Sequence, residues 1–175
     1  MVGNFEARGG RYKDFTLPTS CVVSRIGLFY NSASSYNGRF NDTQSQTPSH
    51  EYTAGIWYKV DAAGILRPPG DEPNGATVIG PLGVKTTKSK DCQETGKAPI
   101  VIGDHYGKTK VVSTDNIKIG NELTVNKLGY LSNSVNTGDL VVARAENDCN
   151  NSAGTAGAST VNLEYNTYQC GYIKD

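Results

Sequence analysis

One short pattern occurs twice in the sequence, and it constrains the fold more than any other feature. Residues 55–66 (GIWYKVDAAGIL) and residues 120–131 (GNELTVNKLGYL) align without a gap on G-x4-V-[D/N]-x2-G-x-L. In each copy an Asx residue opens a turn that a glycine closes: Asp61 and Gly64 in the first, Asn126 and Gly129 in the second. These residue types suit a type I turn whose glycine takes a positive φ and forms a bulge. The repeat predicts two similar β-hairpins, the alternative being a chance match.

Apolar runs elsewhere in the chain indicate further strands. They fall at residues 21–30, 78–84, 99–102, 110–112, 140–145 and 161–165. Pro81 removes a donor from a hydrogen-bonded ladder, which predicts an edge strand or a bulge in the second run. Polar, Gly- and Pro-rich segments predict loops at residues 31–50, 67–75 and 85–97, and a turn at residues 103–107 (GDHYG). No run keeps a helical period for three turns. We therefore predict an all-β fold, a small antiparallel barrel or sandwich built from hairpins with long polar loops.

The first twenty residues differ from the rest of the chain. They are polar, glycine-rich and basic, with dispersed aromatic residues, and they lead into Leu17-Pro18. We expect residues 1–20 to be an extended arm that orders only when a partner buries it, or else a disordered tail. Residues 21–175 then form the β domain, with two hairpin halves at residues 21–98 and 99–175. Deletion of residues 1–16 is expected to leave that domain folded.

The composition bears on partners and metals. The formal net charge is zero and only 19% of the residues are charged, so we expect neither nucleic acid nor a membrane surface as a partner. No window approaches the roughly 18 apolar residues of a membrane span. The four cysteines form no C-x-x-C pair and the two histidines lie far from ligand spacing, so no metal is expected. Cys149 and Cys170 could close the segment between them, but without an apolar leader in the first fifteen residues we expect reduced thiols.

The sequence contains no recognisable catalytic motif. Residues 103–109 (GDHYGKT) differ from a phosphate-binding loop, because three residues rather than four separate the glycines. Asp104 and His105 are adjacent, so on a strand they point to opposite faces and cannot act as a pair. No G-x-S-x-G elbow is present, and nothing selects two of the seventeen acidic residues as a catalytic pair. We expect neither enzymatic activity nor a cofactor.

The order of motifs in the second half resembles that of a known family. The relevant pieces are residues 117–123 (IKIGNEL), 125–129 (VNKLG), 142–146 (VARAE), 154–157 (GTAG) and 161–165 (VNLEY). Within residues 99–165, about two fifths of the chain, this arrangement resembles the capsid decoration (cement) proteins of tailed bacteriophages. Those are small β-barrel proteins that coat phage heads. The chain differs from them in the shorter connection at residues 132–139 and in its long first half.

The resemblance implies a virion structural protein, assembled in the host cytoplasm, that binds the major capsid protein on the capsid exterior and stabilises the particle. Several weak contacts made together would give the necessary avidity. A threefold site on an icosahedral lattice would favour a homotrimer. The arm residues expected to contact the capsid or a neighbouring protomer are Phe5, Arg8, Arg11, Tyr12, Lys13 and Phe15.

The second hypothesis is a carbohydrate- or receptor-binding β-module of a phage fibre or a bacterial surface protein. It requires exposed aromatic rings for stacking, supplied by Trp57, Tyr58 or tyrosines in loops. Trp57 faces opposite to its neighbours Ile56 and Tyr58 if this segment is a strand. The alternative for Trp57 is burial between two sheets.

Overall fold

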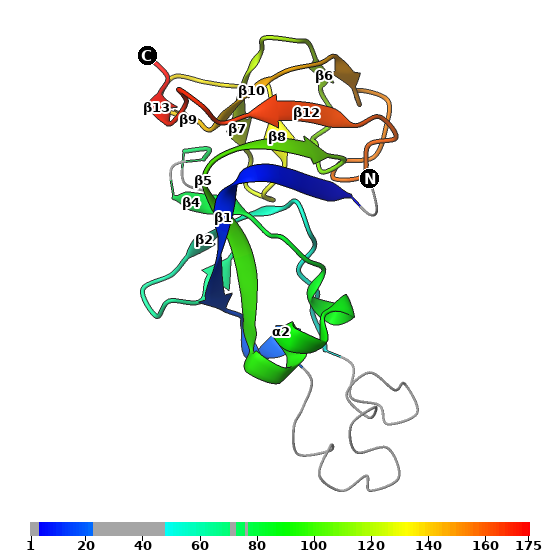
Figure 1. Ribbon diagram of the computed structural model, residues 1–175. Helices are drawn as coiled ribbons and strands as arrows, with labels where there is room; N and C mark the ends of the chain where they lie inside the picture. The colour runs from blue at the N-terminus through cyan, green and yellow to red at the C-terminus, as the bar shows by residue number, and fades with distance from the viewer. Residues whose placement is uncertain (1–3, 23–47, 71–72, 76) are drawn as a thin grey trace, which may run out of the picture.

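The computed structural model describes residues 4–22, 48–70, 73–75 and 77–175 (Figure 1). The prediction of an all-β fold is confirmed, since the described part contains thirteen strands and one short α-helix. The elements in chain order are β1 (Phe5–Thr16), β2 (Trp57–Val60), β3 (Leu66–Arg67), β4 (Val78–Pro81), α2 (Lys90–Thr95), β5 (Lys97–Thr109), β6 (Asn116–Ile117), β7 (Glu122–Val125), β8 (Leu131–Ser132), β9 (Leu140–Val141), β10 (Ala143–Ala145), β11 (Cys149–Asn150), β12 (Leu163–Asn166) and β13 (Tyr172–Ile173). Short 3-10 helices span Thr19–Cys21 and Thr86–Lys88.

The main sheet has six strands in the order β1-β5-β12-β10-β7-β8, and all its pairings are antiparallel. A three-stranded sheet, β3-β2-β4, and two ribbons, β11-β6 and β13-β9, accompany it. β1 and β5 are the longest strands, with 12 and 13 residues. In Figure 1 these two strands run together from an upper body, where β12 lies beside β5, into a lower body that contains α2.

Two hydrophobic clusters form the core, and β2 contributes to both. The upper cluster takes Trp57 together with buried residues from β7, β10 and β12, such as Leu123 and Tyr165. The lower cluster takes Tyr58 with residues such as Leu66 and Ile100. Successive side chains of a strand point to opposite faces. Adjacent Trp57 and Tyr58 are therefore both buried, one in each cluster, and β2 joins the two bodies.

The two repeated segments form hairpins with the same turn, as the sequence predicts. Val60 pairs with Leu66 in the first, and Val125 pairs with Leu131 in the second. Each turn closes with a hydrogen bond from the glycine N–H to the Asx carbonyl, of 3.0 Å from Gly64 and 2.9 Å from Gly129. Both glycines have positive φ, +81° and +89°.

The Asx side chain organises each of these turns. Asp61 Oδ1 accepts hydrogen bonds from the backbone N–H groups two and four residues on, at 2.9 and 3.0 Å. Asn126 Oδ1 accepts the equivalent pair, both at 3.0 Å. These bonds, led by the one from Ile65, lower the pKa of Asp61. The sequence match at residues 55–66 and 120–131 thus corresponds to one local structure used twice.

The prediction of an unpaired N-terminal arm is wrong for residues 5–16. These residues form β1, which pairs with β5 from Phe5 opposite Thr109 to Thr16 opposite Lys97. The few, dispersed aromatic residues of this segment suggested an arm. An edge strand, however, also needs few apolar residues, so this pattern does not distinguish the two. Phe5 packs against the upper cluster and Phe15 against the lower one. The segment is an integral strand of the main sheet.

The turn predicted at residues 103–107 is also wrong, because β5 continues through it. His105 pairs with Gly9, and Ile102 pairs with Arg11, so one extra residue of β5 forms a bulge opposite Gly10. Gly9, Gly10 and Gly103 have φ of +83°, +67° and +80°, which L side chains rarely adopt. These glycines bend the paired strands between the two bodies instead of reversing the chain.

Other expected elements differ in smaller ways. The loop predicted at residues 85–97 contains α2, with Ser89 as the N-cap and Gly96 in the left-handed conformation at the C-terminus. The strand predicted at residues 140–145 is split into β9 and β10. β4 with Pro81 lies at the edge of its sheet, as expected. Most of the strand predicted at residues 21–30 and of the loop at 31–50 falls outside the described residues.

Candidate binding surface

The outer face of the main sheet carries a continuous row of polar side chains from five strands. Arg8 of β1 pairs with Tyr106 of β5, which pairs with Asn166 of β12. Asn166 pairs in turn with Arg144 of β10, and Arg144 with Glu122 of β7. These residues face outward because their neighbours along each strand, such as His105 and Tyr165, point into the upper cluster and are buried.

A second row lies beside the first and has alternating charge. Glu6 of β1 pairs with Lys108 of β5, which pairs with Glu164 of β12. Glu146 follows β10 and donates its backbone N–H to the Glu164 carbonyl at 2.8 Å. Between the rows is a hollow of about 270 Å³, lined by Glu6, Arg8, Tyr106, Gly107, Lys108, Glu146 and Glu164.

Most charged side chains of this hollow have no partner among the described residues. Glu6, Arg8, Lys108 and Glu164 form no ion pair or side-chain hydrogen bond with any residue that the structure describes. Glu146 Oε1 accepts one hydrogen bond, 2.8 Å from Asn166 Nδ2. Opposite charges therefore lie on neighbouring strands without neutralising one another by direct contact.

One tyrosine, Tyr106, lines the hollow, and a second, Tyr168, packs against it. Tyr106 and Tyr168 are 44% and 42% exposed, and their ring centroids lie 5.0 Å apart with an interplanar angle of 38°. A Cβ atom on Gly9 would lie 3.3 Å from the Tyr168 hydroxyl, so the glycine bend of β1 leaves room for this ring. Sequence reasoning missed this site, because its residues meet only through the register of β1, β5 and β12.

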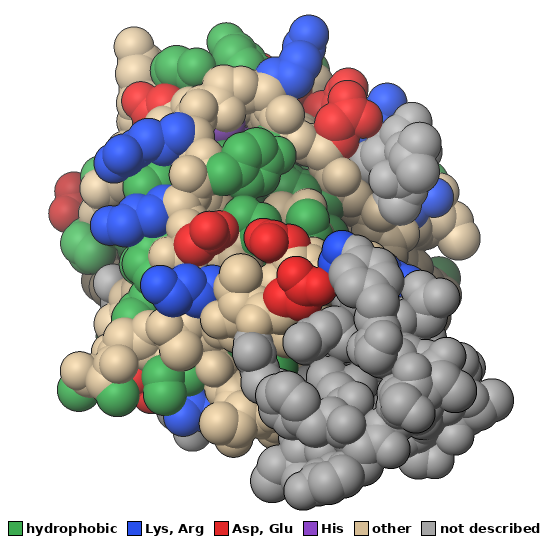
Figure 2. All heavy atoms as spheres, turned by 60° about the horizontal axis from the view of Figure 1, so that its bottom comes forward, with side chains coloured by type: hydrophobic (Ala, Val, Ile, Leu, Met, Phe, Trp, Pro, Cys, Tyr) green, Lys and Arg blue, Asp and Glu red, His purple; other side chains and the backbone are tan. Residues whose placement is uncertain are grey.

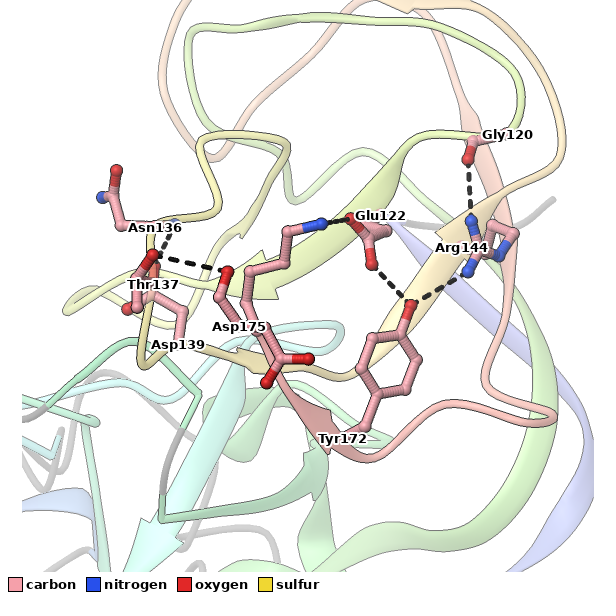
Figure 3. A network of polar contacts seen from close by, with 9 residues as sticks. Gly120, Glu122, Asn136, Thr137, Asp139, Arg144, Tyr172 and Asp175 are labelled. Atoms are coloured by element: carbon pink, nitrogen blue, oxygen red, sulfur yellow. Dashed lines mark hydrogen bonds and ion pairs between the residues drawn. The ribbon is translucent and has the colours of Figure 1, made fainter.

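The other end of the first row is held by the C-terminal segment (Figure 3). The Tyr172 hydroxyl donates to Glu122 Oε2 at 2.6 Å and accepts from Arg144 Nη2 at 2.9 Å. Lys174 Nζ lies 2.6 Å from Glu122 Oε1. The Lys174 ammonium, followed by the Tyr172 hydroxyl, lowers the pKa of Glu122, and the hydrogen bond to Glu122 raises the pKa of Tyr172. This network fixes the last residues against β7 and β10.

The sequence-predicted contact residues of β1 divide into two groups. Arg8, Arg11, Tyr12 and Lys13 are exposed, and Tyr12 reaches 62%. Phe5 and Phe15 are half-buried, so they act chiefly in packing. Lys13 Nζ lies 5.4 Å from the centroid of the Phe15 ring. Among the residues of the described chain, β1 therefore offers an exposed basic and aromatic strand at the edge of the main sheet.

In Figure 2, which brings the bottom of Figure 1 forward, basic side chains lie along the left of the coloured part and acidic side chains lie together near its centre, with hydrophobic ones among them. Within the described ranges, no helix is long and apolar enough to cross a membrane. No group of three His, Cys, Asp or Glu residues in that same part of the chain is arranged to hold a metal ion.

Trp57 and Tyr58, two of the aromatic residues proposed from sequence as a stacking platform, are buried. Trp57 is 5% exposed and Tyr58 is 3% exposed, and Tyr58 stacks on Tyr52 with centroids 4.3 Å apart. From the sequence, the alternative for Trp57 is burial between two sheets; in the structure Trp57 is buried in the upper cluster. Neither ring is exposed enough to serve as a surface stacking platform.

Asp104 is exposed and His105 is buried. The His105 Nε2 lies 2.9 Å from the Tyr165 hydroxyl and its Nδ1 lies 3.1 Å from the Gly103 carbonyl oxygen. Burial is the main cause that lowers the pKa of His105. A more open hollow of about 230 Å³ lies beside it and also borders Trp57 and Cys170. Both ring nitrogens are already engaged, so the imidazole has a structural role in this arrangement.

The four cysteines, Cys21, Cys92, Cys149 and Cys170, are all unpaired, and the first three are buried. Comparison with known proteins gives no family: no family model matches the chain, and no curated protein matches its sequence.

Proposed function

We propose that the protein is a structural component of a phage virion that binds the outer surface of the capsid and stabilises it. The observation that carries this proposal is β1, a twelve-residue edge strand whose residues 8–14 are all exposed. The resemblance of residues 99–165 to capsid decoration proteins supports it independently.

A strand at the edge of a sheet presents unpaired backbone N–H and C=O groups. Another chain can use these groups by adding a strand, with side chains giving specificity. On its outer side, β1 has no strand partner among the described residues apart from a single bridge between Thr16 and Ile65. β1 therefore offers a docking edge for an extended segment of the major capsid protein.

The charges of β1 indicate which kind of segment fits. Arg8, Arg11 and Lys13 outnumber Glu6 and Asp14, so an acidic segment is favoured. Each exposed pair contributes only up to about 1 kcal/mol, so several must act together. A homotrimer on a threefold site would engage three such edges at once and raise the effective concentration of each later contact.

Co-sedimentation with heads that lack this protein, taken from the phage that encodes it, tests the proposal. The Arg11→Glu/Lys13→Glu variant should lose most of its binding, whereas Lys118→Glu/Lys127→Glu, a matched reversal on turns outside β1, should retain it. Unchanged thermal unfolding would show that both variants are folded. Wild-type protein that stays in the supernatant would refute the capsid role.

The oligomeric state is tested separately by light scattering. A trimer has three times the chain mass of 18.7 kDa. A monomer at all concentrations, together with binding to heads, would leave the capsid role standing and refute the trimer.

A further inference from the structure

We propose that the hollow between Tyr106 and Glu164 is a binding site for a neutral saccharide. It lies on the outer face of the main sheet and is distinct from the edge of β1 at Arg11 and Lys13. It therefore adds a second ligand to a protein whose proposed partner is a capsid, and it does not depend on that role.

The charge arrangement argues against an ionic ligand. Lys108 lies on β5, between Glu6 on β1 and Glu164 on β12, so the two carboxylates stand about 10 Å apart at the backbone. No group of three His, Cys, Asp or Glu residues in the described ranges is arranged to hold a metal ion, and a cation in the hollow would also meet Arg8 and Lys108. An anion would face three carboxylates, from Glu6, Glu146 and Glu164.

A neutral polyhydroxylated ligand matches the same arrangement. Each sugar hydroxyl both donates and accepts a hydrogen bond, so neighbouring hydroxyls can donate to Glu164 and accept from Lys108 or Arg8. Hydrogen bonds to charged groups are stronger than bonds between neutral groups. The groups of Glu6, Arg8, Lys108 and Glu164 are available for this purpose, because no ion pair with a described residue engages them.

Tyr106 supplies the apolar part of the site. The C–H face of a pyranose ring is apolar and can pack on an aromatic face by dispersion and area burial. Tyr106 lines the hollow, and its ring packs against the Tyr168 ring at a centroid distance of 5.0 Å. Ligand sites commonly combine aromatic walls with a few fixed polar groups. The volume of about 270 Å³ suits one or two sugar rings rather than a long chain.

The test is a titration of the ¹⁵N-labelled protein, followed by NMR, with glucose, galactose, N-acetylglucosamine, maltose and lactose. Concentrations up to about 50 mM detect the millimolar affinity expected of a shallow site. At least one sugar should shift the amide signals of Tyr106, Lys108, Glu164 and Tyr168 in a saturable way. Sodium sulfate and calcium chloride at equal ionic strength should not shift these signals.

Matched variants locate the binding. Tyr106→Ala and Glu164→Gln should each weaken sugar binding about fivefold or more. Tyr12→Ala, which removes an exposed tyrosine of β1 that does not line the hollow, should leave sugar binding unchanged. Tyr106→Ala should still co-sediment with heads, which separates this site from capsid binding. The proposal is overturned if no sugar in the panel gives saturable shifts, if the shifts map away from the hollow, or if sulfate or calcium binds there instead.

Discussion

The two matching turns allow one prediction to be made with an internal control. Gly64 and Gly129 occupy the same turn position with nearly the same φ, but their surroundings differ. A Cβ at Gly64 would meet no heavy atom within 4 Å. A Cβ at Gly129 would lie 2.5 Å from both Ile56 Cγ2 and the Trp57 carbonyl oxygen. Alanine at these two positions therefore separates backbone strain from steric conflict.

The expected losses of unfolding free energy differ accordingly. Gly64→Ala should lose about 1 kcal/mol, because alanine disfavours the left-handed backbone conformation and nothing else opposes it. Gly129→Ala adds overpacking against the β2 backbone, for a total of about 3 kcal/mol. In a domain of this size these losses lower the thermal midpoint by about 3 °C and about 9 °C. Asn tolerates positive φ, so Gly64→Asn should recover much of the loss, but Gly129→Asn should not.

The assay is thermal and urea unfolding followed by circular dichroism and by the fluorescence of Trp57, the sole tryptophan. Trp57 also donates its backbone N–H to the Gly129 carbonyl at 3.0 Å, so its emission should change in Gly129→Ala but not in Gly64→Ala. Equal losses for the two alanine variants would refute the reasoning. Equal losses would mean that the turn at Gly129 does not pack on β2.

Three further predictions concern other parts of the fold. Deletion of residues 1–16 should abolish cooperative thermal unfolding, because it removes the strand that pairs along β5; a folded truncated domain, measured by circular dichroism, would contradict the placement of β1. Burial lowers the pKa of His105 in the folded protein below its ordinary value of 6.5. As the pH falls, the unfolded chain therefore binds a proton at this residue before the folded protein does, and the free energy of unfolding should fall. Urea midpoints at pH 7.5 and pH 5 should therefore differ less in His105→Gln than in the wild type, and His50→Gln should behave like the wild type. Tyr172→Phe removes the hydroxyl between Glu122 and Arg144 and should speed release of the C-terminal residues by carboxypeptidase, whereas Tyr12→Phe should not.

Local features of the fold could be predicted from the sequence. The hairpin turns follow from Asp61, Gly64, Asn126 and Gly129, because the bonds that form them join residues at most four apart. A signal for α2 was also present, since Ser89 begins the helix and Gly96 ends it. It was missed because so short a helix has no apolar period to reveal it.

Long-range features could not be predicted. The segment at residues 103–107 has turn-forming residues, but it stays extended because β1 on one side and β12 on the other pair with it. The candidate saccharide site combines Glu6, Tyr106 and Glu164, which meet only once the strand register is known. Nothing in a single sequence specifies that register, since β1 lacks the apolar alternation that would mark it as a strand.

The partnership of β1 and β5 also determines the order of events when the chain is made. The hairpins close over a few residues, Val60 with Leu66 and Val125 with Leu131, and can form as soon as they emerge. Phe5 must wait for Thr109, and loop closure over so long a separation is slow. β1, which is synthesised before the other described strands, is thus among the last to be placed. Until then β5 keeps an open edge, and this edge is where nascent chains are most prone to associate with one another.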